Sequence, residues 1–305
     1  MKLRVRRPPS PFRLLKERYF GEEARNPWVA RNALKRLAPC LPADVVPVVS
    51  EAVESLIAFQ DPDYALLYLD RIERYVGPAG VVLPEIGELA RLLSARMHFE
   101  DPIRIAQLRL AEAGGAAAAP DPAAADRIER FRWDEIVRML PVAAAEIALD
   151  ILPRLKLAGR HLTLRFGVRS RLRLRWLRAL AALRLTRPFS LRFRIERAWV
   201  ERWLHMIDRS LLTQPDAAVE IVRTAALIEG HDDAYWDGMA QWHAIIDALV
   251  KPVCDGTLPL PRLGEAVRTA RQTAQAEPGP GALAAVIARL RTQAPGGGAM
   301  LAAGE

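Results

Sequence analysis

A repeating helical spacing of apolar and aromatic residues constrains the fold of this chain more than any other feature. Within residues 59–76 such side chains fall at positions 65, 68, 69, 72 and 76, which share one face of a helix. Asp61-Pro62 opens this run and Asp101-Pro102 opens another. An aspartate N-cap followed by a first-turn proline is typical of a helix start. The spacing therefore predicts an all-α fold, a multi-helix assembly.

The same signals continue along the chain, and glycines mark several of the expected helix ends. The helices are predicted at 44–59, 62–76, 83–97, 102–113, 123–130, 132–151, 170–185, 190–211, 216–229, 233–250, 262–275 and 280–292. Pro47 and Pro141 are expected to kink or split two of them. We expect three parts: a basic N-terminal arm at 1–39, a helical domain at 40–292 with a loop or linker at about 114–125, and a disordered tail at 293–305.

One segment has two competing periods. In residues 161–176 apolar side chains alternate with arginines, which is typical of a strand. From Ser170 onward the same residues also fit a helix, with Leu172, Trp176 and Leu183 on one face and arginines on the opposite face. We expect a short extended segment at 161–168 followed by a helix at 170–185.

Basic residues are concentrated in two segments. The chain has a formal net charge of +8, and residues 154–197 hold fourteen Lys/Arg against Glu196 alone. Residues 1–18 are also basic, so the remaining residues are acidic overall. Codon usage on a solvated face is one explanation; a docking surface for an acidic protein, a nucleic acid or a phosphate group is another. The candidate partner-binding or anion-binding residues are Arg169, Arg171, Arg173, Arg175 and Arg178.

Composition excludes several classes of protein. Hydrophobic residues make up 51% and charged residues 26% of the chain, and no apolar stretch is long enough to span a membrane. The basic N-terminus lacks the apolar core of a secretory signal, so a cytoplasmic location is expected. Cys40 and Cys254 are too few for a disulfide scaffold or an iron–sulfur cluster. No Gly-rich phosphate loop precedes a predicted helix, and the acidic body argues against nucleic-acid binding.

The best polar cluster consists of His231, Asp232, Asp233 and Asp237, with His243 further along. Imidazole and carboxylate groups together can bind a metal or act as a base with its orienting acid. However, Asp232 or Asp233 follows a helix-ending glycine and precedes a helical run, which favours an N-cap. We therefore predict a helix cap, with no metal site.

The other histidines and the tryptophans have simpler interpretations. We expect His98, His161 and His205 to be partly buried structural residues. The stripe of Ile195, Trp199, Trp203 and Met206 has the spacing of a helix face packed in the core.

Several stretches resemble, in order, one known family. FQDPDYALLYLDRIERYV at 59–76, MHFEDPIRIAQLR at 97–109 and ALIEGHDDAYWDGMAQWHAIIDAL at 226–249 are similar to the helical region of the indolepyruvate:ferredoxin oxidoreductase beta subunit. The matching motif residues are Gln60, Asp61, Tyr64, Tyr68, Asp70, Arg71, Glu100, Asp101, Arg104, Gly230, Asp233 and Gly238. Where the family has Lys-Gly-Tyr-Gly-Asp, this chain has EGHDD at 229–233. The α/β catalytic-gamma-type domain that begins the family subunit has no counterpart before residue 40.

The resemblance implies an accessory, non-catalytic subunit of a complex that oxidatively decarboxylates an aryl 2-oxoacid. Thiamine diphosphate and iron–sulfur clusters would belong to a partner subunit, and this chain is expected to need no cofactor. Two alternatives remain: an independent helical module that binds an anionic ligand or acidic protein through its arginines, and an enzyme that uses His231, Asp233 and His243.

Overall fold

The computed structural model describes residues 26–77, 80–117, 119–277 and 279–293. Within these ranges the chain is mostly helical, with two small antiparallel strand pairs, so the predicted multi-helix fold is confirmed. No helix in this part of the chain is both long and apolar enough to cross a membrane. Residues 1–25 of the predicted arm and the predicted tail beyond residue 293 lie outside the described residues.

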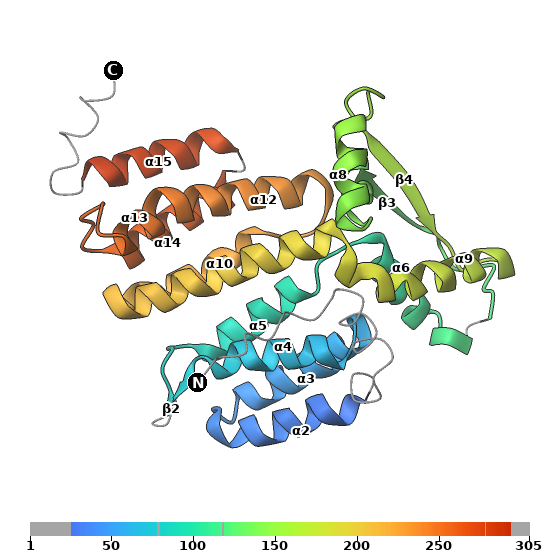
Figure 1. Cartoon of the computed structure of the whole chain (residues 1–305), viewed down its shortest axis with the longest axis horizontal. Coiled ribbons are helices and arrows are strands. Elements are labelled where there is room, and N and C mark those ends of the chain that lie inside the picture. The colour runs from blue at the N-terminus through green and yellow to red at the C-terminus, as the bar shows by residue number, and fades with distance from the viewer. Residues whose placement is uncertain (1–25, 78–79, 118, 278, 294–305) are drawn as a thin grey trace, which may run out of the picture.

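An N-terminal layer of helices begins within the predicted basic arm. It consists of α2 (Pro27–Leu37), the 3₁₀ turn η2 (Ala38–Cys40), α3 (Val45–Phe59), α4 (Pro62–Glu73) and α5 (Ile86–Met97), shown in blue to cyan in Figure 1. The short strands β1 (Val76–Gly77) and β2 (Gly80–Val81) pair between α4 and α5. Asp61 caps α4 as predicted, since its side chain accepts a 2.8 Å hydrogen bond from the Tyr64 N–H.

The long helix α10 (Leu191–Thr213) crosses the molecule between this layer and a C-terminal group of helices (Figure 1). The C-terminal group comprises η5 (Pro215–Ala217), α11 (Ala218–Arg223), η6 (Thr224–Leu227), α12 (Asp232–Ile245), the π-helical turn η7 (Ile246–Val250), α13 (Lys251–Cys254), α14 (Leu263–Ala276) and α15 (Pro280–Thr292). The helix predicted at 216–229 is therefore a short α-helix between two 3₁₀ turns.

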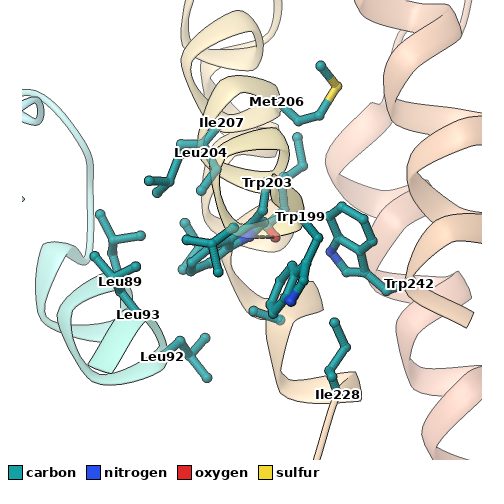
Figure 2. Packing of buried hydrophobic residues seen from close by; sticks show 14 of the residues in the cluster. Leu89, Leu92, Leu93, Trp199, Trp203, Leu204, Met206, Ile207, Ile228 and Trp242 are labelled. Atoms are coloured by element: carbon teal, nitrogen blue, oxygen red, sulfur yellow. Dashed lines mark hydrogen bonds between the residues drawn. The ribbon is translucent and has the colours of Figure 1, made fainter. Parts of the chain in front are cut away.

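The main hydrophobic core surrounds α10. Trp199, Trp203 and Met206 are buried, as the sequence pattern predicts, and Trp203 is fully inaccessible to solvent. Figure 2 shows these side chains between leucines of α5 on one side and Trp242 of α12 on the other. The indole N–H of Trp203 donates to the carbonyl oxygen of Ile221 at 3.0 Å, so this buried polar group is paired.

A small antiparallel strand pair lies at one end of the helical layers (Figure 1). β4 (His161–Phe166) is the extended segment expected from the sequence, and it pairs along its whole length with β3 (Arg127–Arg132). The predicted helix at 123–130 is therefore wrong. Residues on β3 alternate between the two sheet faces, with Phe131 packed inward and Ile128 exposed. Pairing with a distant strand decides the conformation here.

The sheet and its neighbouring helices enclose a second, smaller core. The helices are α6 (Pro102–Glu112), α7 (Trp133–Arg138) and α9 (Arg171–Ala182), and α8 (Val142–Ile151) packs on α7. The 3₁₀ turn η4 (Leu183–Phe189) leads from α9 into α10. Pro141 separates α7 from α8, so the helix predicted at 132–151 is split there.

The predicted linker at about 114–125 lies against this smaller core. It starts with the 3₁₀ turn η3 (Gly115–Ala117), and the Asp121 N–H donates to the Val168 carbonyl at 3.1 Å. The side chain of Arg109 donates to the Ala125 carbonyl at 2.7 Å. The described part of the segment is therefore fixed to the end of β4 and to α6.

Glu220 on α11 provides a test of the packing of α11 on α14. Burial raises its carboxyl pKa, but hydrogen bonds from Arg271, Arg268 and Arg223 outweigh burial, so the pKa is lowered overall. A lowered folded-state pKa contributes stability above the unfolded-state pKa of about 4.3, and that stability is lost as the pH falls through the folded-state value.

We expect Glu220→Gln to reduce the free energy of unfolding by about 1–3 kcal/mol at pH 7. The difference from the wild type should shrink in acid, because the wild-type carboxyl then protonates. Urea denaturation at pH 7 and in steps down to pH 3 measures both effects. Glu51→Gln, at an exposed position without an ion pair in the described chain, is the control. An equal loss at every pH would contradict this assignment.

Candidate functional site

The candidate arginines on and beside α9 have different surroundings. Arg169 donates to the Pro122 carbonyl at 2.9 Å, and Arg173 pairs with Asp126 at 2.6 Å. Arg178 is half-buried and engaged with neighbouring groups. Arg171 and Arg175 are exposed, and among the described residues neither has an ion-pair or side-chain hydrogen-bond partner. Two of the five predicted residues therefore remain free to bind a partner.

The buried face of α9 differs from the one that the sequence predicts. Leu174 and Leu177 are buried against the smaller core, which includes α6 residues. Leu172 is 77% exposed and Leu183 is 45% exposed, so their predicted packing is wrong, whereas Trp176 is 40% exposed with its ring 5.6 Å from that of Phe166 in the smaller core. The helix carries two apolar stripes, and the one that completes the smaller core is buried. The other stripe lies on the surface beside the unpaired arginines.

Arginines further along the basic segment are used inside the protein. Arg187, on η4, is 2% exposed and forms a two-pronged ion pair with Asp101, at 2.9 Å and 3.0 Å. It also donates to the Phe59 carbonyl at 2.8 Å, and its guanidinium lies 4.0 Å from the centre of the Phe59 ring. Acids from other segments therefore neutralise part of the charge that the sequence shows as uncompensated.

A second buried arginine lies in the first turn of α10. Arg192 is 4% exposed, and its Nε lies 2.8 Å from Glu196 while its guanidinium stacks on Tyr235 at 3.8 Å. Glu135 approaches to 3.9 Å, and burial raises the pKa of its carboxyl despite the nearby Arg192. Burial also raises the pKa of the Tyr235 hydroxyl well above its ordinary value. A layer of buried charge, formed by Arg192, Glu196 and Glu135, therefore lies where α7, α10 and α12 meet.

Several residues of the family resemblance gather around Arg187 and Phe59. Gln60 donates to the Arg184 carbonyl at 2.9 Å and lies 3.4 Å from Arg187. Asp101 caps α6 by accepting from the Arg104 N–H at 2.6 Å, in addition to its ion pair with Arg187. The Arg104 guanidinium lies over the Phe59 ring at 5.6 Å. Sequence motifs far apart in the chain thus meet in one structural network.

The remaining motif residues of α4 are mainly structural. The hydroxyls of Tyr64 and Tyr68 donate to backbone carbonyls of Met97 and Ala90, both at 3.1 Å. Arg71 is buried and pairs with Glu201 of α10 at 2.7 Å. Asp70 is exposed. These contacts join α4 to α5 and α10.

The loop before α12 does not form the predicted cap. His231 occupies the N-cap position without a side-chain cap, and Asp232 has a left-handed backbone with φ of 62°. The Asp232 N–H donates instead to Glu135 at 3.1 Å. Asp232 and Asp233 lie near His161 of β4, with oxygens 2.7 Å and 3.5 Å from its Nε2. Glu135, which is distant in sequence, therefore accepts from the first backbone N–H of α12 in place of the predicted cap.

The two histidines that the enzyme alternative would need lie apart. His231 stacks on Phe131 and its Nδ1 donates to Glu100 at 2.9 Å, which raises the pKa of the imidazole. His243 lies beside Arg202 and Asp247 instead, while Asp237 is exposed. The described positions therefore do not bring His231, Asp233 and His243 into one catalytic cluster.

The three isolated histidines have different outcomes. His98 is partly buried and hydrogen-bonded to the Ser94 carbonyl at 2.7 Å, and burial lowers its pKa, as expected of a structural residue. His205 is exposed, contrary to the prediction. His161 lies beside Asp232 and Asp233 of α12, and its position in the sequence gives no sign of this contact.

Comparison with known protein families gives a match over most of the chain. Residues 45–248 match the model of a family of unknown function (DUF6537). No curated protein and no solved structure matches the chain.

The motif residue Gly238 provides a test of how closely α12 approaches η6. A Cβ at this position would overlap the Leu227 carbonyl oxygen. We expect Gly238→Ala to lower the free energy of unfolding by about 1–3 kcal/mol, because backbone atoms must move apart. Gly281→Ala on α15 is the matched control, since a Cβ there meets no atom within 4 Å. Chemical denaturation compares the two; equal effects would contradict the close approach.

Arg192 provides a test of the buried charge layer. We expect Arg192→Met to lower the free energy of unfolding by about 3–5 kcal/mol, because Glu196 and Glu135 remain buried without their cation. Arg175→Met removes an exposed arginine and should change stability by less than about 0.5 kcal/mol. Thermal and urea unfolding of both variants measure the difference. A loss below 1 kcal/mol for Arg192→Met would show that the layer contributes little.

Proposed function

The chain belongs to the DUF6537 family, whose function is unknown, and we propose that it is an accessory, non-catalytic module that docks onto an acidic protein. The proposal rests on the exposed face of α9. Leu172 and Trp176 lie one helical turn apart on this face, and Leu183 and Leu185 in the following turn η4 are also exposed. We refer to these residues, with Arg171 and Arg175, as the α9 surface.

The composition of the α9 surface is typical of a protein interface. Interfaces combine an apolar centre with a polar rim, and they are enriched in tryptophan and arginine. Here Leu172 and Trp176 supply apolar area, while Arg171 and Arg175 supply cations on the same helix. Isolated exposed leucines are common on proteins, but a helical stripe with flanking arginines is a better fit to a binding surface.

The charges indicate what kind of partner fits. Arg173, Arg187 and Arg192 already pair with acids of this chain, whereas Arg171 and Arg175 have none within the described ranges. An arginine fork binds a carboxylate through two parallel hydrogen bonds. The complement of the α9 surface is therefore an apolar patch bordered by Asp or Glu on another protein.

The sequence resemblance suggests the partner. We propose that it is a thiamine-diphosphate-type subunit of an indolepyruvate:ferredoxin oxidoreductase-like complex in the cytoplasm. That subunit would contain the thiamine diphosphate and the iron–sulfur clusters. The converging motif residues Gln60, Asp101 and Arg104 would then maintain the fold that presents the α9 surface, without contacting substrate.

A second candidate function has an observation of its own. Arg130 and Arg165 lie on the same outer face of the β3–β4 sheet, because their strand partners Thr163 and Ile128 share that face. Both arginines are exposed, and neither has a side-chain partner among the described residues. This arrangement favours an independent helical module that binds an anionic ligand on the sheet.

The docking proposal is tested by charge reversal on the α9 surface. The probe is the purified thiamine-diphosphate subunit of the indolepyruvate:ferredoxin oxidoreductase from the same cells. We expect the wild type to bind it, with affinity falling as salt rises. The double variant Arg171→Glu/Arg175→Glu should lose binding by at least about tenfold while keeping its helical circular dichroism spectrum, because like charges then face each other.

The matched control is Arg36→Glu/Arg289→Glu, which makes the same change of charge at exposed positions on α2 and α15. It should bind as the wild type does. Equal losses of binding in both double variants would show that overall charge, and not the α9 surface, determines binding. An absence of wild-type binding would exclude this partner. Binding of inorganic phosphate that disappears in Arg130→Glu/Arg165→Glu would support the second candidate instead.

A further inference from the structure

His161, Asp232 and Asp233 bring three metal-binding groups together from two separate elements. His161 begins β4, and the two aspartates form the first turn of α12. One donor atom from each residue lies within 4.8 Å of the others. Asp232 Oδ1 and Asp233 Oδ2 lie 2.7 Å and 3.5 Å from His161 Nε2. A cation between these atoms would need only small side-chain movements.

The two closest metal-binding atoms of the cluster, His161 Nε2 and Asp232 Oδ1, are buried but do not point at each other. His161 Nε2 and Asp232 Oδ1 are inaccessible to solvent, and neither makes a hydrogen bond with suitable geometry. Buried polar atoms in proteins are nearly always hydrogen-bonded, whereas these two atoms lie at ion-pair distance without a well-directed hydrogen bond. A shared ligand placed between them would satisfy both.

Neighbouring side chains orient the third donor. Arg132 lies 3.3 Å from Asp233 Oδ1 and 2.9 Å from Asp134, so it contacts the Asp233 oxygen that is not the one nearest His161. A positioned outer partner of this kind is common around metal-binding carboxylates. Asp233 is 63% exposed in its side chain, so water can reach the open side of the cluster.

We propose that His161, Asp232 and Asp233 bind one divalent transition-metal cation, for which Zn²⁺ is the best-fitting ion. One imidazole nitrogen and two carboxylate oxygens leave a coordination position for water, which is a donor set that Zn²⁺ accepts. The ion joins β4 to the start of α12, and thus the small sheet to the C-terminal helices. This site is independent of the docking function proposed for α9.

The test uses the full purified chain, freed of metal by chelation and dialysis. Zn²⁺ is added in a calorimetric titration, and Co²⁺ is added in parallel because its visible spectrum reports coordination. We expect one equivalent to bind and the melting temperature to rise in its presence, since a ligand of the folded state stabilises it.

His161→Gln and Asp233→Asn should each weaken binding by at least about tenfold and remove the rise in melting temperature. His205→Ala, at an exposed histidine away from the cluster, should bind as the wild type does. Circular dichroism of the metal-free variants establishes that they are folded. Absence of stoichiometric binding by the wild type, or unchanged binding by folded His161→Gln, would overturn the proposal.

Discussion

The buried ion pair between Arg187 and Asp101 is the contact on which the arrangement of the elements depends. Asp101 caps α6 while it accepts both prongs of the Arg187 guanidinium, and the same guanidinium binds the carbonyl at the end of α3. Arg187 lies on the turn between α9 and α10. One side chain therefore ties the N-terminal layer, the smaller core and the central helix together, and it fixes where α9 leaves the body.

The arginines of the basic segment fall into a buried group and an exposed group, which have different physical roles. Arg187 and Arg192 are buried and compensated by acids at the N-cap of α6, on α7 and on α10. On α9 and β4, Arg165, Arg171 and Arg175 face solvent without acids. Buried pairs of this kind specify an arrangement, whereas exposed cations are available to steer and bind an acidic partner. The docking proposal rests on the exposed, unpaired arginines, and the net charge of the basic segment alone could not support it.

Local signals predicted the parts of the fold that depend on neighbours in sequence. The Asp-Pro starts of α4 and α6 and the tryptophan face of α10 were predictable because caps and helical faces are set within a few residues. β3 was not predictable from its neighbours in sequence, because it pairs with β4, which lies far along the chain. The buried face of α9 depended on which of two apolar stripes completes the smaller core, and the place of His161 beside Asp232 depends on the same tertiary packing.

A double-mutant cycle on Arg187 and Asp101 tests the central claim most directly. Arg187→Met removes the cation, and Asp101→Asn removes the charge while keeping a side chain that can still cap α6. The unfolding free energies of the wild type, both single variants and the double variant give the coupling energy. We expect a coupling of about 2 kcal/mol or more, because the pair is buried and doubly hydrogen-bonded. Effects that add within about 0.5 kcal/mol would contradict a joint role for these two residues.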